Sequence, residues 1–97
     1  MYEIEITREA IDDLRAFRKR ERRSVVEGIE RELRYEPARE TRNRKRLRPN
    51  KLAEWELRLG QYRVFFDVDR AADVVKVIAV GRKRGNRLYI RDEEFNL

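Results

Sequence analysis

The sequence predicts an α+β fold, formed as a single domain over residues 1–97 with the element order β-α-α-β-β-β. Three observations predict it. With 97 residues the chain can form one small domain but not two. Apolar residues recur at helical spacing in the first third of the chain, and they alternate with polar residues from residue 55 onward. Two short helices with narrow apolar faces need a sheet to cover, so we expect a helical hairpin on one face of an antiparallel sheet.

The N-terminal elements follow from these patterns. Residues 2–7 alternate between apolar and polar side chains, which predicts a short strand. Thr7 is a good N-cap for a first helix with Ile11, Leu14 and Phe17 on its apolar side.

A second helix is expected to start at the capping-box pattern of residues 24–27 and to end at Pro37. Ile29 and Leu33 lie on its apolar side. Residues 37–51, "PARETRNRKRLRPNK", have little periodicity and are predicted to be a basic loop.

The second half of the chain predicts a hairpin followed by a buried strand. Residues 55–59 and 62–68 alternate, and Gly60-Gln61 between them fits a two-residue type II′ turn. A turn at 69–73 leads to the apolar run 74–80, as suits a strand buried on both faces. Residues 92–95 fit a turn or a short strand.

The turn sets the register of the hairpin and therefore separates two faces. Arg58 falls directly opposite Arg63, and Glu56 opposite Phe65, on one face of the sheet. The other face is expected to pack against the helices and carries Trp55, Leu57, Leu59, Tyr62, Val64 and Phe66.

Two arginines opposite each other repel, at a cost of a few tenths of a kcal/mol to about 1 kcal/mol. An anion held between them would offset this cost, and the planar guanidinium suits bidentate contact with phosphate. The alternative is that both side chains extend into water and that Glu56 neutralises one of them.

The stretch "VGRKRGNRLYI" at residues 80–90 places four cations after the apolar strand. Gly81 and Gly85 permit unusual backbone angles, so the chain is expected to turn back across the sheet. This turn would bring Arg82, Lys83, Arg84 and Tyr89 toward Arg58 and Arg63. The alternatives for the cations are a patch like a nuclear-localisation signal or a solvated turn, and the alternative for Tyr89 is a core position in a terminal strand.

The composition excludes several kinds of chemistry. The absence of Cys and His removes disulfides, thiolate metal sites, cysteine nucleophiles and histidine as acid or base. Glu56 is then the only obvious base beside the arginines, and RNA cleavage by 2′-hydroxyl attack needs no metal or cofactor. The net charge of +6 is concentrated in residues 39–51 and 82–87, which predicts a nucleic-acid partner unless the charge is only a solvated surface.

The runs "WELRLGQYRVFFDVD" and "VIAVGRKRGNRLYI", with the basic "TRNRKRLRPN" segment, resemble the RelE/ParE superfamily of type II toxin–antitoxin toxins, in particular its RelE-like branch. The resemblance extends over nearly the whole chain. It implies a small twisted antiparallel sheet with the helical hairpin on one face. The RelE branch cuts mRNA in the ribosomal A site, the ParE branch inhibits DNA gyrase, and both are neutralised by an antitoxin protein.

Carried onto this chain, the resemblance implies roles for individual residues. Arg58 and Arg63 would hold the scissile phosphate, and Glu56 or a basic side chain would take the proton of the 2′-hydroxyl. Lys83, or else Arg84, would stabilise the leaving group, and Tyr89 would orient or stack a base. Several relatives carry a histidine near the C-terminus, which is absent here. Contacts to RNA and the ribosome are expected from Arg44, Lys45, Arg46, Arg48, Lys51, Arg82, Arg84 and Arg87.

The sequence thus favours an mRNA endoribonuclease that depends on the ribosome, with an antitoxin as its protein partner. The alternatives are a gyrase inhibitor without nuclease activity and a binding module without activity. No apolar run approaches the roughly 20 residues of a membrane span, and "MYEIEI" lacks the pattern of a signal peptide. We therefore expect a cytoplasmic protein.

Overall fold

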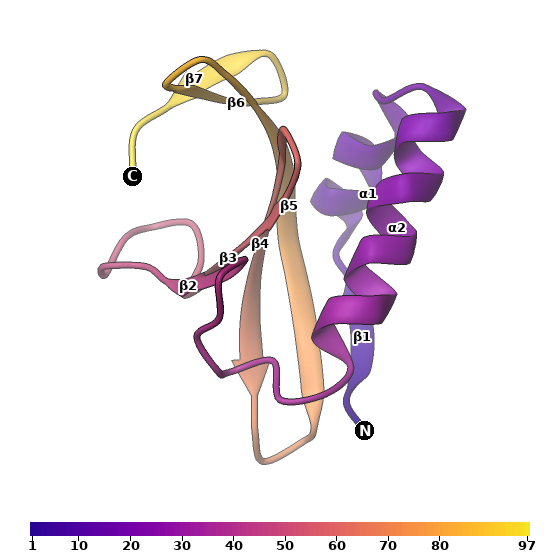
Figure 1. Cartoon of the computed structure of the whole chain (residues 1–97), viewed down its shortest axis with the longest axis vertical. Helices are drawn as coiled ribbons and strands as arrows, with labels where there is room; N and C mark the ends of the chain where they lie inside the picture. Colours follow the sequence, from indigo (N-terminus) through magenta and orange to yellow (C-terminus); the bar gives the residue numbers. More distant parts are fainter.

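A computed structural model describes all 97 residues and confirms the α+β fold (Figure 1). The helices are α1 (Arg8–Arg15) and α2 (Lys19–Leu33). The strands are β1 (Glu3–Ile6), β2 (Arg44–Arg46), β3 (Trp55–Leu59), β4 (Tyr62–Asp69), β5 (Val74–Arg84), β6 (Arg87–Ile90) and β7 (Glu93–Phe95).

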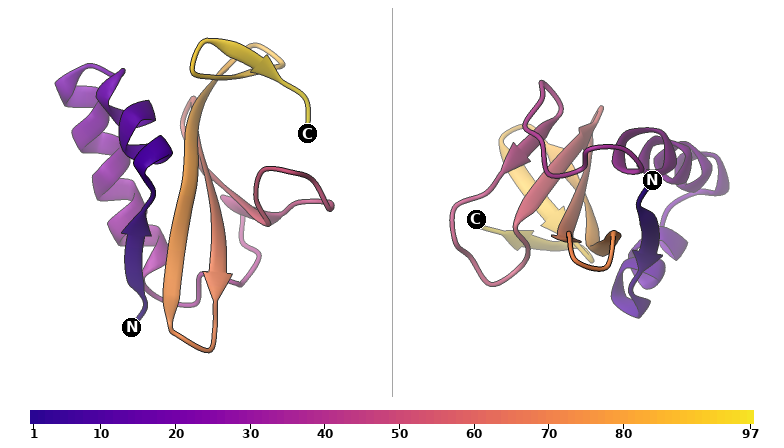
Figure 2. Two further views of the ribbon diagram at one scale, coloured as in Figure 1. Left: turned by 180° about the vertical axis from the view of Figure 1, so that it is seen from behind. Right: turned by 90° about the horizontal axis from the view of Figure 1, so that it is seen from below.

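The strands form one sheet in the order β2-β3-β4-β5-β6-β7, with antiparallel pairs throughout this path. β1 pairs in parallel with the first half of β5, while β6 pairs with its last residues. Both helices cover one face of the sheet (Figure 2). The β2–β3 connection and the C-terminal hairpin lie on the other side, which positions the candidate site.

The predicted register of the β3–β4 hairpin is confirmed. Arg58 pairs with Arg63 and Leu59 with Tyr62. Gly60 has φ +59°, whereas Gln61 stays outside the positive-φ region, as a type II′ turn requires. The two faces of the hairpin therefore carry the side chains that alternation predicts.

Two apolar clusters lie on opposite faces of the sheet. The larger one, beneath the helices, includes Trp55, Leu57, Val64 and Phe66 of the predicted core face, with Leu59 and Tyr62 packed against it. The smaller one lies on the other face and is formed by Ala53, Phe65, Ala79, Leu88 and Ile90. This second cluster fixes the C-terminal strands to the face that carries the arginines.

Three local predictions need correction. α2 begins at Lys19 rather than at residue 24, because Glu21 accepts a hydrogen bond from the backbone N–H of Arg18 at 3.1 Å and caps the helix there. The segment 37–51 is not all loop, since β2 adds to the edge of the sheet. The predicted order lacks β6, which continues the sheet beyond β5, whereas β7 confirms the short strand that was one of the two options for residues 92–95.

The two glycines of residues 80–90 have different roles. Gly85 has φ +62° and allows the tight β5–β6 turn, as predicted. Gly81 adopts no unusual angle and lies within β5. A Cβ at Gly81 would lie 2.7 Å from the backbone oxygen of Tyr89, so glycine is needed for the close approach of β6.

No helix is long and apolar enough to cross a membrane. The cap of α1 agrees with the prediction, because the Thr7 hydroxyl accepts a hydrogen bond from the N–H of Ala10 at 3.2 Å.

Candidate functional site

A cationic cavity of about 320 Å³ lies on the sheet face opposite the helices. Five cationic side chains and two acidic ones contribute to its lining, so its walls are positively charged overall. The cations are Lys45, Arg58, Arg63, Lys83 and Arg87, and the acids are Glu56 and Glu94. The apolar part of the lining comes from Leu47, Leu88, Phe95 and Leu97.

Strand register explains why these side chains converge. Lys45 of β2 pairs with Glu56 of β3, and Arg58 pairs with Arg63. On β5, Gly81 lies opposite Arg63, and Lys83 projects to the same side because residues two apart share a face. Four neighbouring strands thus each place charge around one point.

Glu56 lies at the centre of the cluster. It is only 9% exposed, and its Oε1 is 3.5 Å from Nε of Arg63 and 3.9 Å from Nε of Arg58. One carboxylate therefore compensates part of the repulsion between the paired arginines. This arrangement leaves a net positive charge at the mouth of the cavity, where Arg58 is half exposed.

Arg63 is held rigidly by the turn that precedes it. Its Nη1 donates to the carbonyl oxygens of Gly60 at 2.6 Å and Tyr62 at 2.9 Å. Burial lowers the pKa of the Arg63 guanidinium, and Glu56 opposes that shift. With Nη1 engaged by the backbone, Nη2 and the buried Nε, which has no hydrogen-bond partner, are the donors that remain.

Tyr89 does not reach this cavity, contrary to the prediction. Tyr89 pairs with Arg82 across β5 and β6, and both side chains face the helices. Arg82 stacks over Phe17 and Tyr62, and Arg84 lies 5.7 Å from the Tyr89 ring. Of the three cations at residues 82–84, only Lys83 lines the cationic cavity.

Arg44 is also placed differently from the prediction of an RNA contact. It is 8% exposed, and its Nη1 donates to the carbonyl oxygens of Glu32, Tyr35 and Glu36. The Glu32 carbonyl lies in the last turn of α2 and the other two lie just beyond it, where carbonyls lack helical donors. Arg44 therefore caps the helix, and its guanidinium is not available to nucleic acid.

Three other predicted RNA contacts from the basic segment 37–51 do not line the cationic cavity. Arg46 lies 5.7 Å from the Trp55 ring and, like Arg48, is exposed outside the cationic cavity. Lys51 is exposed as well. Arg87, at the cavity, is 3.6 Å from Glu94.

The C-terminal wall of the cavity was missed by sequence reasoning. Glu94, Phe95, Asn96 and Leu97 line it because β7 folds back beside β6. Arg91 and Asp92 in the intervening turn have φ +52° and +63°. Asn-Gly is the usual sequence for two such residues in a hairpin turn, and it is absent here. Phe95, an apolar residue three positions after Asp92, was the available signal. No group of three or more side chains is arranged to hold a metal ion.

Comparison with known proteins gives a consistent result. Residues 4–87 match the family model described as ParE toxin of type II toxin–antitoxin system, parDE. No curated protein matches the chain in sequence.

Three solved structures share the fold. The toxin–antitoxin complex RelBE2 from Mycobacterium tuberculosis is 28% identical with a TM-score of 0.73, over 84% of this chain and 98% of that one. The archaeal RelE–RelB complex from Pyrococcus horikoshii OT3 is 28% identical with a TM-score of 0.66, over 87% and 96%. The intact E. coli RelBE complex matches at a TM-score of 0.61 and 18% identity, over 87% and 99%, and supports the fold alone.

Proposed function

The chain belongs to the ParE toxin family of type II toxin–antitoxin systems, and we propose that it is a ribosome-dependent endoribonuclease that cuts mRNA in the cationic cavity. It is a toxin of the RelE/ParE fold. The observation that carries the proposal is the convergence of Arg58, Arg63 and Lys83 around the buried carboxylate of Glu56.

The proposed reaction is attack by the ribose 2′-hydroxyl on the adjacent phosphorus. Glu56 accepts the 2′-hydroxyl proton as the O–P bond forms, and the bond to the 5′-oxygen of the next nucleotide breaks. Lys83 donates a proton to that leaving oxygen. The products are a 2′,3′-cyclic phosphate and a 5′-hydroxyl, and no water or redox partner enters this step.

The arginines stabilise the charge that develops on the phosphate. The hairpin places both side chains on one face of the sheet, and the Arg63 guanidinium is held in addition by the turn carbonyls. Donors that are already oriented cost little reorganisation at the transition state, which is why such groups supply a large part of catalysis. Lys45 and Arg87, farther out on the walls, would bind neighbouring phosphates.

The lining of the cationic cavity supports dependence on the ribosome, because it has few side chains that could hold an RNA base. Phe95 is its one aromatic side chain, since Tyr89 faces the helices. Cations alone bind a phosphate backbone without selecting a base. We therefore assign the positioning of the mRNA to the ribosome, with Arg46, Arg48 and Lys51 as candidate contacts to ribosomal RNA.

A cognate antitoxin protein is the proposed partner, because the structures similar to this chain are toxin–antitoxin complexes. An acidic segment lying over the cationic cavity would block the binding of RNA. It would pair with those cations of the cavity that the cavity's own acidic residues leave uncompensated. The C-terminal strand β7, at the edge of the sheet and part of the cavity wall, is the element that such a segment would displace or cover.

Inhibition of DNA gyrase is the second candidate, favoured by the family model, whose name is ParE. This function needs no catalytic residues. It offers no reason for the repulsive Arg58–Arg63 pair to be kept beside Glu56 and Lys83.

One experiment separates the two candidates. Messenger RNA 5′ ends are mapped in a translation extract that contains the toxin, and supercoiling by purified gyrase is measured in parallel. We expect new 5′ ends on translated mRNA and unchanged supercoiling. Inhibited supercoiling without new 5′ ends would assign the chain to the gyrase inhibitors, and no effect in either assay would leave a binding module.

A further inference from the structure

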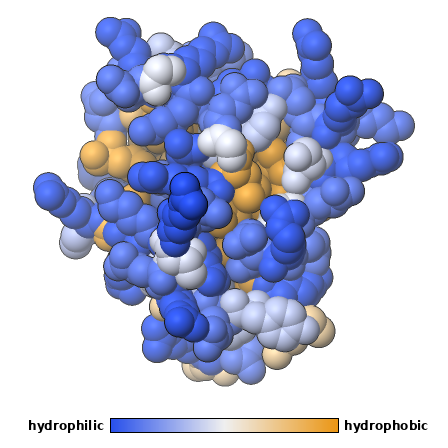
Figure 3. Space-filling view, in the orientation of Figure 1, coloured by the Kyte–Doolittle hydropathy of each residue, from blue (hydrophilic) through white to orange (hydrophobic).

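A second cationic surface lies at the turn between α1 and α2. We call it the hairpin tip, after the hairpin that the two helices form. It comprises five exposed cations, which are Arg15, Arg18, Lys19, Arg20 and Arg23. None of the five takes part in an ion pair, although the molecule has eight. The space-filling view shows hydrophilic residues over the upper end of the helices (Figure 3).

Three of these cations lie where they are unfavourable for α2, whereas Arg15 lies in the last turn of α1, where a cation is favourable. Arg18 is the N-cap residue of α2, and Lys19 and Arg20 lie in its first turn. The positive end of the helix dipole favours acidic side chains there and disfavours cations. A sequence selected only for stability would place Asp or Glu at these positions, so the cations indicate an anionic partner.

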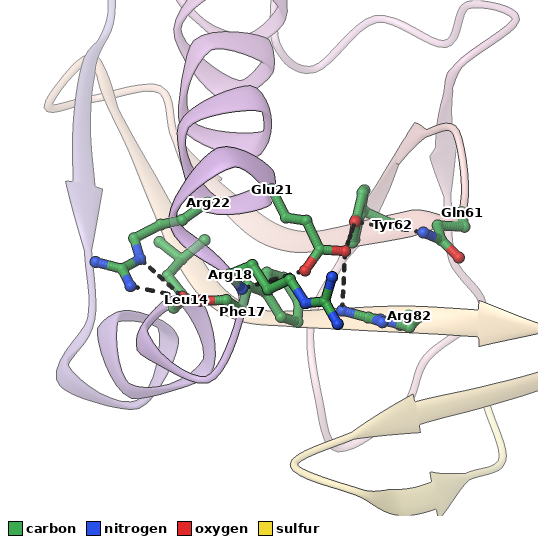
Figure 4. A network of polar contacts seen from close by, with 8 residues as sticks. All are labelled: Leu14, Phe17, Arg18, Glu21, Arg22, Gln61, Tyr62 and Arg82. Carbon is green, nitrogen blue, oxygen red and sulfur yellow. Dashed lines mark hydrogen bonds and ion pairs between the residues drawn. The ribbon is translucent and has the colours of Figure 1, made fainter.

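The one acidic residue of the tip is already engaged (Figure 4). Glu21 accepts hydrogen bonds from the Tyr62 hydroxyl and from the backbone N–H of Arg18, and it lies 3.5 Å from Arg82. The Tyr62 hydrogen bond lowers the pKa of Glu21. Arg22 is also engaged, since it donates to the carbonyl oxygens of Leu14 and Phe17 at the end of α1. The five tip cations are left without a protein partner.

The hairpin tip and the cationic cavity flank the same β-turn. Tyr62, which binds Glu21 of the tip, follows the Gly60-Gln61 turn directly. On its other side, the carbonyl oxygens of Gly60 and Tyr62 hold Arg63 of the cavity. Both the turn and the tip lie at the upper end of the molecule in Figure 1.

We infer that the hairpin tip binds the phosphate backbone of RNA, as the continuation of the strand held in the cationic cavity across the Gly60-Gln61 turn. This inference rests on the proposed function. It assigns the cations at residues 15–23, which lie outside the basic segments that the sequence pattern singled out, to substrate binding.

The chemistry of the tip favours nucleic acid over an acidic protein. Protein interfaces depend on apolar and aromatic anchors at their centre. No large apolar residue is exposed within the tip, since the exposed ones are Met1, Ile11, Tyr35 and Leu97. Arg18, Lys19 and Arg20 are consecutive and point to different sides of the helix axis, which suits a flexible polyanion better than one face of a partner helix.

The test compares two variants that lose the same charge. R18Q/K19Q/R20Q removes tip cations, and R31Q/R70Q/K76Q removes three from the end of α2, the β4–β5 turn and β5, away from the tip. Binding of a labelled single-stranded 2′-O-methyl RNA, which cannot undergo 2′-hydroxyl attack, is measured from low to moderate salt. Each lost contact to a phosphate lowers the magnitude of the slope of log K against log salt by roughly 0.7. We therefore expect this magnitude to fall by about 2 for the tip variant, which loses three cations, and to change little for the control.

Two further readouts, the melting temperature and binding to poly-glutamate, make the result decisive. The melting temperature of the tip variant should be unchanged or higher, because the helix dipole no longer opposes the cations. A lower melting temperature, or equal slopes in the two variants, would overturn the inference. A tip variant that keeps its RNA slope but loses binding to poly-glutamate would assign the surface to an acidic protein instead.

Arg63→Ala in the same assay separates this inference from the proposed function. If the Arg63→Ala slope falls and the tip variant's does not, the cavity binds RNA and the tip inference fails. If the slope falls only for the tip variant, the hairpin tip binds RNA and the cationic cavity does not.

Discussion

Replacing Arg63 with alanine is expected to abolish growth inhibition while leaving the protein folded. The side chain lies outside the main core and lines the cationic cavity. Its loss removes two hydrogen bonds to the turn carbonyls, at about 1 kcal/mol each. It also leaves Glu56 with Arg58 as its arginine partner, at 3.9 Å. Removal of a fixed donor to a developing oxyanion costs about 100- to 1,000-fold in rate, which is enough to end toxicity.

The measurement is growth after induction, together with thermal unfolding of the purified variant. Arg70→Ala is the matched control, because Arg70 is an exposed arginine in the β4–β5 turn. Arg63→Lys keeps the charge without the planar fork and should be intermediate. Undiminished toxicity of a stably folded Arg63→Ala protein would remove the cationic cavity from the mechanism.

Replacing Trp55 with alanine should have the largest effect on stability, a loss of about 3–5 kcal/mol in the free energy of unfolding. Trp55 is 3% exposed and belongs to the cluster beneath the helices. Its ring stacks on Phe66 with centroids 6.1 Å apart, and the Arg46 guanidinium lies 5.7 Å from its centroid. A small domain has a total stability of only about 5–15 kcal/mol, so much of it would be lost.

Urea unfolding followed by circular dichroism measures this loss. Tyr35→Ala is the control, because Tyr35 is an aromatic residue that is 67% exposed, and we expect a change within about 0.5 kcal/mol. Coincident unfolding curves for wild type and Trp55→Ala would mean that the hairpin faces are inverted.

Apolar periodicity and the residues of the turn were sufficient to predict the part of the fold that carries the site. The alternation around Gly60-Gln61 placed Arg58 opposite Arg63 and Trp55 on the core face, and the structure has both. Register follows from local patterns because side chains on a strand alternate strictly.

Features that depend on contacts distant in sequence were not predictable in this way. Arg44 reads as one cation in a basic run, but it caps α2 because the chain returns past the end of that helix. Tyr89 was expected at the phosphate site, yet the register of β6 against β5 turns it to the helices. The parallel pairing of β1 with β5 and the short edge strand β2 leave no periodic signal of their own.

The most direct test of the central claim, that the cationic cavity cuts RNA by 2′-hydroxyl attack, is the chemistry of the fragment ends. Messenger RNA fragments from toxin-treated translation extracts would be analysed for their termini, with Arg63→Ala as the reference. We predict 2′,3′-cyclic phosphate and 5′-hydroxyl ends with the wild type and no such fragments with the variant. Fragments that end in 3′-hydroxyl and 5′-phosphate, or that persist with Arg63→Ala, would contradict it.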